Sequence, residues 1–228
     1  MNPLAASFIS TRLAVHALAE HVLCGVRYAA VGRIGLLPTP DGVATPPFDD
    51  RTVGLRGLEL FDLGPGGERR APVTTLRAAA EHFGTTVGVP PLWTPVTTPD
   101  PEAPLSIGGT ELQLLARWFA LVGEALATQA PEASPTLWPE HFDLAITVGD
   151  TSLGDTTFGG SPGDTEHDQP YLYVLPPSPE PDGDRSFWNE PFGAAISYDR
   201  IRTAGDAANF FADAVARIRS APPPEDRG

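Results

Sequence analysis

Six prolines within residues 88–106 exclude a regular helix from the middle of this chain. Proline lacks the backbone N–H that an interior helical position donates, and its ring clashes with the preceding turn. The segment GVPPLWTPVTTPDPEAPLS therefore predicts an extended connector. We treat residues 1–228 as one domain, in which this connector separates an N-terminal half, residues 1–87, from a C-terminal half, residues 107–220. A polar tail, residues 221–228, follows.

Apolar residues at helical spacing predict amphipathic helices on both sides of the connector. Short apolar segments at 32–73, with a turn at Asp41-Gly42, predict strands, as do FDLAITV, LYVL and FGAAISY in the second half. The expected fold class is α+β, with a mainly antiparallel sheet packed against several helices. Both halves are predicted to contain a helix, several strands and a second helix, so a structural duplication is left open. The predicted helices and their caps are 11–28, 74–84 (Thr74 or Thr75 to Gly84), a helix capped by Thr110 with Gln113, and a last helix capped by Thr203 with Asp206.

Charge and composition exclude several functional classes. The formal net charge is −14, and surfaces that bind nucleic acid or anionic membranes are basic, so we expect neither partner. All fifteen basic residues are arginines, which excludes lysine Schiff-base chemistry. Cys24 is the single cysteine, so no intrachain disulfide forms. No signal peptide and no apolar run of membrane-spanning length is found, which predicts a cytoplasmic protein.

The run GDTSLGDTTFGGSPGDTEHD, residues 149–168, invites several interpretations. A phosphate loop of the Walker type requires a lysine, and this chain has none. The pentapeptide around Ser161 matches the nucleophile elbow of serine hydrolases, but Pro162 removes the backbone N–H that would stabilise the oxyanion. The acidic positions miss the spacing of a calcium loop. The run is expected to be a flexible rim rather than a rigid cage.

A set of histidines and carboxylates survives these exclusions. If FDLAITV is a strand, His141 and Asp143 point to the same side of it, and Asp164 and His167 follow in the acidic run. Such groups could serve as an acid–base pair or hold a divalent metal, although we do not favour the metal. His16 and His21 lie about 140° apart on an α-helix, so they are not expected to chelate one ion from the same face, and a structural role is expected for them. His82 is expected to place a positive charge at the end of its helix.

Four blocks in the second half resemble those of an uncharacterised family of hypothetical proteins common in actinobacteria. They are LWPEHFDLAITV, GGSPGD, QPYLYV and FWNEPFGA, and the resemblance extends over nearly the whole chain. That family is distantly similar to a broader bacterial family of unknown function. The resemblance implies no particular activity.

The aromatic residues of these blocks predict a pocket. Tyr171 and Tyr173 share one face of their strand, and tyrosine and tryptophan carry polar groups that require partners when buried. The leading hypothesis is a protein that binds a small molecule in this pocket, and no particular cofactor is predicted. The second hypothesis is an enzyme that uses the same pocket, with His141, Asp143 and Asp164 as its catalytic groups. A protein-interaction module is a third hypothesis, and a homodimer is left open. The expected ligand-binding residues are Trp138, His167, Tyr171, Tyr173, Trp188 and Asn189.

Overall fold

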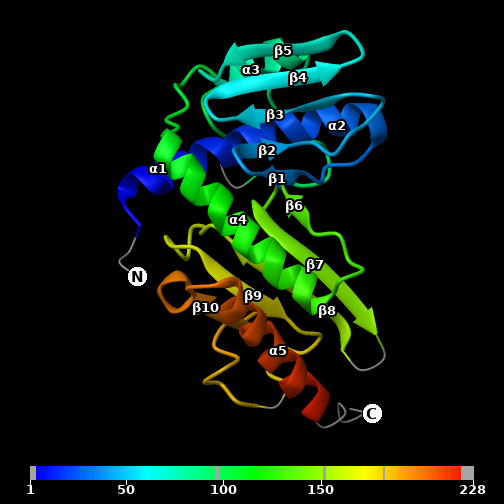
Figure 1. Cartoon of the computed structure of the whole chain (residues 1–228), viewed down its shortest axis with the longest axis vertical. Coiled ribbons are helices and arrows are strands. Elements are labelled where there is room, and N and C mark those ends of the chain that lie inside the picture. The colour runs from blue at the N-terminus through cyan, green and yellow to red at the C-terminus, as the bar shows by residue number, and fades with distance from the viewer. Residues whose placement is uncertain (1–3, 96–97, 151–152, 182, 222–228) are drawn as a thin grey trace. The chain divides into compact units, whose positions relative to one another are not determined.

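The fold was analysed in a computed structural model that describes residues 4–95, 98–150, 153–181 and 183–221. The predicted α+β class is confirmed, because helices accompany two antiparallel five-stranded sheets (Figure 1). The chain divides into two compact units, each treated separately below. Of the described residues, the N-terminal unit comprises 4–120 and 136–143, and the C-terminal unit comprises 121–135 and 144–221.

The N-terminal unit begins with one long helical segment that contains an irregular turn. Helix α1 (Ala6–Leu18) continues into a π-helical turn (Ala19–Leu23) and then into α2 (Cys24–Val31). Gly32 ends the segment in the left-handed conformation, at φ 67°. The predicted helix at 11–28 lies within this segment, but its sequence gives no signal for the π-helical turn.

The sheet of this unit is an antiparallel meander in which every strand pairs with the next along the chain. Pro40 and Asp41 form the turn between the first two strands, one residue before the predicted Asp41-Gly42, because Gly42 already pairs with Thr39. Its last strand lies at the edge and is exposed along most of its length. The strands are β1 (Leu37–Thr39), β2 (Gly42–Ala44), β3 (Thr52–Arg56), β4 (Glu59–Gly64) and β5 (Gly67–Pro72).

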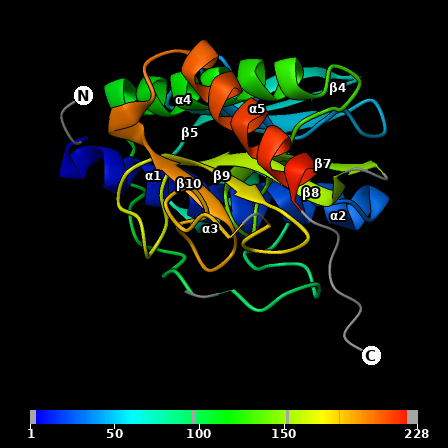
Figure 2. The ribbon, with the colours of Figure 1, turned by 90° about the horizontal axis from the view of Figure 1, so that it is seen from below.

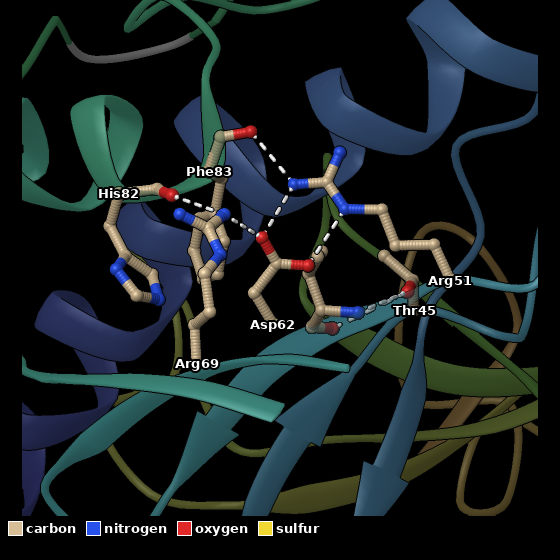
Figure 3. Close-up of polar contacts among 7 residues, drawn as sticks. Thr45, Arg51, Asp62, Arg69, His82 and Phe83 are labelled. Carbon is tan, nitrogen blue, oxygen red and sulfur yellow. Dashed lines mark hydrogen bonds and ion pairs between the residues drawn. The ribbon is translucent and has the colours of Figure 1, made fainter. Parts of the chain in front are cut away.

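Helix α3 (Leu76–Phe83) has the ends that its sequence predicts. The Thr75 side chain accepts a hydrogen bond from the backbone N–H of Ala78, and Gly84 is left-handed at φ 72°. Burial, followed by the charge of Arg69, lowers the pKa of His82 and disfavours the positive charge expected there. The carbonyls of Phe83 and His82, at the carboxyl end of the helix, accept hydrogen bonds from the guanidinium groups of Arg51 and Arg69 (Figure 3).

Helix α4 (Gly109–Gln129) begins one residue before the predicted cap. Thr110 already lies inside the helix, so the expected capping role of Thr110 is wrong. The division between the two units falls within α4, after Ala120. Among the described residues, no helix combines the length and the apolar character needed to cross a membrane.

The second sheet has the strand order β10-β9-β8-β7-β6. Helix α5 (Ala204–Ser220) lies over one face of the sheet (Figure 2), where Phe211 contacts Phe158 edge to face. The predicted Thr203 cap is confirmed, and Thr203 and Asp206 exchange hydrogen bonds in a capping box. The strands are β6 (Thr136–Trp138), β7 (Asp143–Asp150), β8 (Gly154–Ser161), β9 (Tyr171–Leu175) and β10 (Ala194–Ser197).

Strand β8 was not predicted, because it occupies the glycine-rich run interpreted as a flexible rim. It lies between β7 and β9, with Gly159 paired with Tyr173 and Gly160 paired with Leu172. A Cβ atom on Gly159 would lie 2.5 Å from the Tyr173 ring, and one on Gly160 would lie 2.5 Å from Val122 of α4. The glycines therefore admit an aromatic ring on one face of the sheet and a helix on the other.

Candidate functional site

The centre of the candidate site is His167, whose imidazole lies between two carboxylates of the C-terminal unit. Its Nε2 lies 3.2 Å from Oε1 of Glu190, and its Nδ1 lies 3.6 Å from Oδ1 of Asp164. All three side chains are partly exposed, at 31% for His167, 24% for Glu190 and 34% for Asp164. We call these three residues the His167 cluster. Solvent can therefore reach part of the cluster, but the Nδ1 atom of His167 is itself buried and has no hydrogen-bond partner among the described residues.

Asp164 is held in place by hydrogen bonds from several directions. The Tyr171 hydroxyl donates to its Oδ2 at 2.5 Å, and the backbone N–H groups of Glu166 and His167 donate to its Oδ1 at 2.8 and 2.7 Å. Burial opposes ionisation, but these hydrogen bonds outweigh it and hold the pKa of Asp164 below its ordinary value. Asp164 is therefore a fixed negative charge at neutral pH.

The two tyrosines of β9 form the aromatic base beside the cluster. The Tyr171 ring lies 4.5 Å from the His167 ring, and 6.2 Å separates the centroids of Tyr171 and Tyr173. Both tyrosines are buried, and Phe192 packs against Tyr173 edge to face. The structure therefore brings four of the predicted residues together: Asp164, His167, Tyr171 and Tyr173. Glu190 was not predicted, and only its position two residues after Trp188 in the FWNEPFGA block could have indicated it.

Asn189 and Trp188 have structural contacts of their own. The Asn189 side chain donates to the carbonyl of Ala195 at 3.2 Å and accepts from its N–H at 2.9 Å, which attaches the Glu190–Gly193 turn to β10. Trp188 is almost fully buried, and its ring meets Phe187 edge to face. Asn189 thus positions the turn that carries Glu190, and Trp188 packs in the interior of the C-terminal unit.

Trp138, His141 and Asp143 belong to the N-terminal unit and are described apart from the cluster. The expectation that His141 and Asp143 face the same side is wrong, since His141 is exposed in a turn and Asp143 is buried at the start of β7. Between them Phe142 has a left-handed backbone, at φ 54°, which breaks the alternation of a strand. Trp138, on β6, is exposed.

Ser161 ends β8 as a buried residue, and its hydroxyl accepts a hydrogen bond from the N–H of Gly163 at 3.1 Å. A nucleophile elbow places its serine at an exposed turn between a strand and a helix. The segment after Ser161 leads instead to β9, without an intervening helix among its residues. This geometry agrees with the rejection of a hydrolase elbow.

A second cluster lies in the N-terminal unit, at the π-helical turn. The Nε2 atoms of His21 and His16 lie 3.3 and 3.9 Å from Oε2 of Glu20, and the indole N–H of Trp93 donates to Oε1 at 2.9 Å. Both histidines therefore lie close to one carboxylate oxygen, which the angle of about 140° on a regular α-helix did not predict. A π-helical turn is closed between residues i and i+5, and this brings residues with that spacing toward one side.

Burial governs the titration of this second cluster. It lowers the pKa of His16, against the opposing charge of Glu20, and it raises the pKa of the Cys24 thiol to about 12. The pKa of Glu20 is lowered, because hydrogen bonds from His21 and Trp93 outweigh the effect of burial. His16 also stacks on Phe142, with ring centroids 5.0 Å apart, and bonds to the Pro139 carbonyl at 2.9 Å. These contacts connect three segments of the unit and indicate a structural role.

No group of three or more histidine, cysteine, aspartate or glutamate residues suited to a metal ion occurs among the residues that the structure describes. Comparison of the chain with protein-family models, with curated proteins and with solved structures gives no match. Functional inference therefore rests on the geometry of the clusters themselves.

Proposed function

We propose that the C-terminal unit binds a small cationic molecule at the His167 cluster. The observation that carries the proposal is the placement of one partly exposed imidazole between two partly exposed carboxylates. Asp164 and Glu190 carry two negative charges, so the cluster keeps a net charge of about −1 with His167 protonated and about −2 with His167 neutral. A bound ammonium or guanidinium group would balance this excess.

The surroundings of the cluster support a ligand of this kind. Asp164 is fixed by Tyr171 and by backbone N–H groups, so little conformational freedom is lost when a ligand binds. Asn189 fixes the turn that carries Glu190 in the same way. Fixed carboxylates recognise organic cations through their charge and through charge-assisted hydrogen bonds.

Calorimetric titration with ethylammonium, guanidinium and tetramethylammonium chlorides tests the proposal, with sodium acetate as the anionic comparison at equal ionic strength. We expect saturable binding of at least one cation and none of acetate. Loss of one charged hydrogen bond costs about 1.5–3 kcal/mol, so Glu190→Gln should weaken binding by about tenfold or more.

The matched control is Glu180→Gln, which changes an exposed carboxylate of the same unit that is paired with Arg185. This variant should bind the cation as the wild type does. Equal weakening by Glu190→Gln and Glu180→Gln would mean that only overall charge matters, and the proposal would be wrong.

Acid–base catalysis is the second candidate function, and a specific contact favours it. Glu190 is partly exposed and lies 3.2 Å from Nε2 of His167, so this carboxylate can exchange a proton with a substrate while the imidazole orients it; Nδ1, on the side of Asp164, is buried. The catalytic set expected from the sequence was His141, Asp143 and Asp164, and His167 takes the place of His141 in this proposal. His167→Gln should then abolish turnover of a substrate while the cation still binds.

A further inference from the structure

A second polar site lies in the N-terminal unit, where two guanidinium groups meet one buried carboxylate (Figure 3). Arg51 binds Asp62 with two parallel hydrogen bonds, from Nε to Oδ1 at 2.8 Å and from Nη2 to Oδ2 at 2.9 Å. Arg69 approaches the same carboxylate from the other side and donates to Oδ2 from its Nη2. Two positive charges on one negative charge leave an excess of about +1.

One arginine already completes the structural connection at this place. Arg51 satisfies both oxygens of Asp62 and also donates to the Phe83 carbonyl at 2.8 Å, which connects the sheet to the end of α3. Arg69 adds a bond to the His82 carbonyl at 3.1 Å, yet its side chain remains 63% exposed. A purely structural connection does not require this second, exposed charge.

Arg69 retains donors for a ligand. A guanidinium group carries five N–H donors, and those of Arg69 on Nε and Nη1 make no hydrogen bond within the described part of the chain. The same holds for Nη1 of Arg51. Charged donors of this type bind carboxylate and phosphate oxygens strongly.

The space beside these donors is open. A depression of about 360 Å³ is lined by both arginines, by Asp62 and by three glycines of the β4–β5 hairpin, Gly64, Gly66 and Gly67. A Cβ atom on any of the three glycines would meet no heavy atom within 4 Å. The absence of side chains here lets a small ligand approach the arginines and the backbone of the hairpin.

The acidic residues of β4 and β5 do not fill this site. Glu68 binds Arg56 and Arg70, and Glu59 binds Arg70. Glu68 and Arg70 alternate with Arg69 along β5, so they point to the opposite face of the sheet. Asp62 is therefore the single carboxylate among the residues that line the depression.

We propose that this depression is a binding site for a small oxyanion, a carboxylate or a phosphate group, held by Arg69 and Arg51. The local excess charge of about +1 attracts such a group, although the formal net charge of the whole chain is −14. This site lies in the N-terminal unit, whereas the His167 cluster lies in the C-terminal unit, so failure of one proposal does not affect the other.

The test is a titration of the wild-type chain with sodium acetate and with inorganic phosphate, in chloride of equal ionic strength. Binding is followed by calorimetry and by the Nε–H resonances of the arginines. We expect a saturable shift of Arg69 with at least one anion, and the anion that gives it identifies the group bound. Arg69→Gln should weaken binding by about tenfold or more, because one charged hydrogen bond is worth about that factor.

Arg70→Gln is the matched control, since Arg70 is the next residue of the same strand, is also exposed and lies on the other face. It should change the affinity by less than about twofold. No saturable shift of Arg69 with either anion would overturn the proposal, and so would equal weakening by the two substitutions. If Arg69→Gln fails to fold, the wild-type resonances decide alone, because a specific site shifts Arg69 and leaves Arg70 unchanged.

Discussion

The indole N–H of Trp93 donates a hydrogen bond of 2.9 Å to Oε1 of Glu20, a residue 73 positions earlier. This bond connects the proline-rich connector to the π-helical turn, and the N–H of Gly88 adds a second connection, to the His21 carbonyl at 3.0 Å. The connector of the N-terminal unit is thus attached to the helical segment at a buried carboxylate.

Replacement of Glu20 tests this attachment. Glu20→Ala leaves the indole N–H of half-buried Trp93 without its acceptor and buried His21 without its partner, and an unsatisfied buried group costs about 1–3 kcal/mol. We expect Glu20→Ala to lower the free energy of unfolding by about 2–4 kcal/mol, as measured by urea denaturation. Glu124→Ala, at an exposed position of α4, should change it by less than about 0.5 kcal/mol. A cost of Glu20→Ala no larger than this control would contradict the attachment.

The same cluster predicts how stability depends on pH. Burial lowers the pKa of His16 below 6.5, so at acidic pH the unfolded state binds a proton that the folded state resists. Stability should therefore fall as the pH decreases from about 6.5 toward the lowered pKa of folded His16. The lowered pKa of Glu20 adds a further loss at pH values below 4.5. Both effects have the same sign.

Urea denaturation between about pH 7.5 and about pH 5.5 measures the contribution of His16. His16→Gln should flatten the dependence, whereas His141→Gln, at an exposed position, should leave it as in the wild type. An identical slope for His16→Gln and the wild type would show that His16 does not couple folding to protonation.

Gly159 tests the packing of the unpredicted strand. Gly159→Ala places a methyl group 2.5 Å from the Tyr173 ring, so the ring must move. Overpacking of this kind costs about 1–3 kcal/mol. Gly109→Ala is the control, because its Cβ would meet no atom within 4 Å and alanine favours a helix. Thermal denaturation should show a lower melting temperature for Gly159→Ala alone, and equal temperatures for both variants would contradict the packing.

Tyr171→Phe removes one of the hydrogen bonds that stabilise the charged form of Asp164. Because that bond lowers the pKa of Asp164, its loss should raise the pKa. A carboxyl ¹³C titration by NMR reads this value directly. The same titration of the wild-type chain provides the comparison. An unchanged pKa in Tyr171→Phe would show that the tyrosine does not stabilise the charge.

Local signals predicted both ends of α3 and the start of α5, because a cap depends on a few neighbouring residues, but they misplaced the start of α4. Thr75 and Gly84 bound α3, and Thr203 with Asp206 starts α5, as their types and spacing indicate. Strand β8 escaped prediction because glycine favours loops locally. A glycine is needed at position 159 because the Tyr173 ring of β9 leaves no room for a Cβ atom, and the sequence of β8 alone does not reveal this contact.

The candidate site shows the same division between local and long-range information. The sharing of one strand face by Tyr171 and Tyr173 followed from alternation, and both contribute to the buried group beside the cluster. The pairing of His141 with Asp143 failed because one left-handed residue, Phe142, lies between them. Glu190 reaches His167 across 23 positions through a turn, a contact that the spacing of residues does not predict.

The most direct test of cation binding by the C-terminal unit is an NMR titration of the wild-type chain with guanidinium and alkylammonium chlorides, observed at the histidine ring protons. His167 and His141 report in the same sample, one between two carboxylates and the other exposed in a turn of the N-terminal unit. A ligand at the His167 cluster should shift His167 saturably and leave His141 unchanged. Absence of a saturable shift at His167 with every cation, or an equal shift of both histidines, would contradict the proposed function.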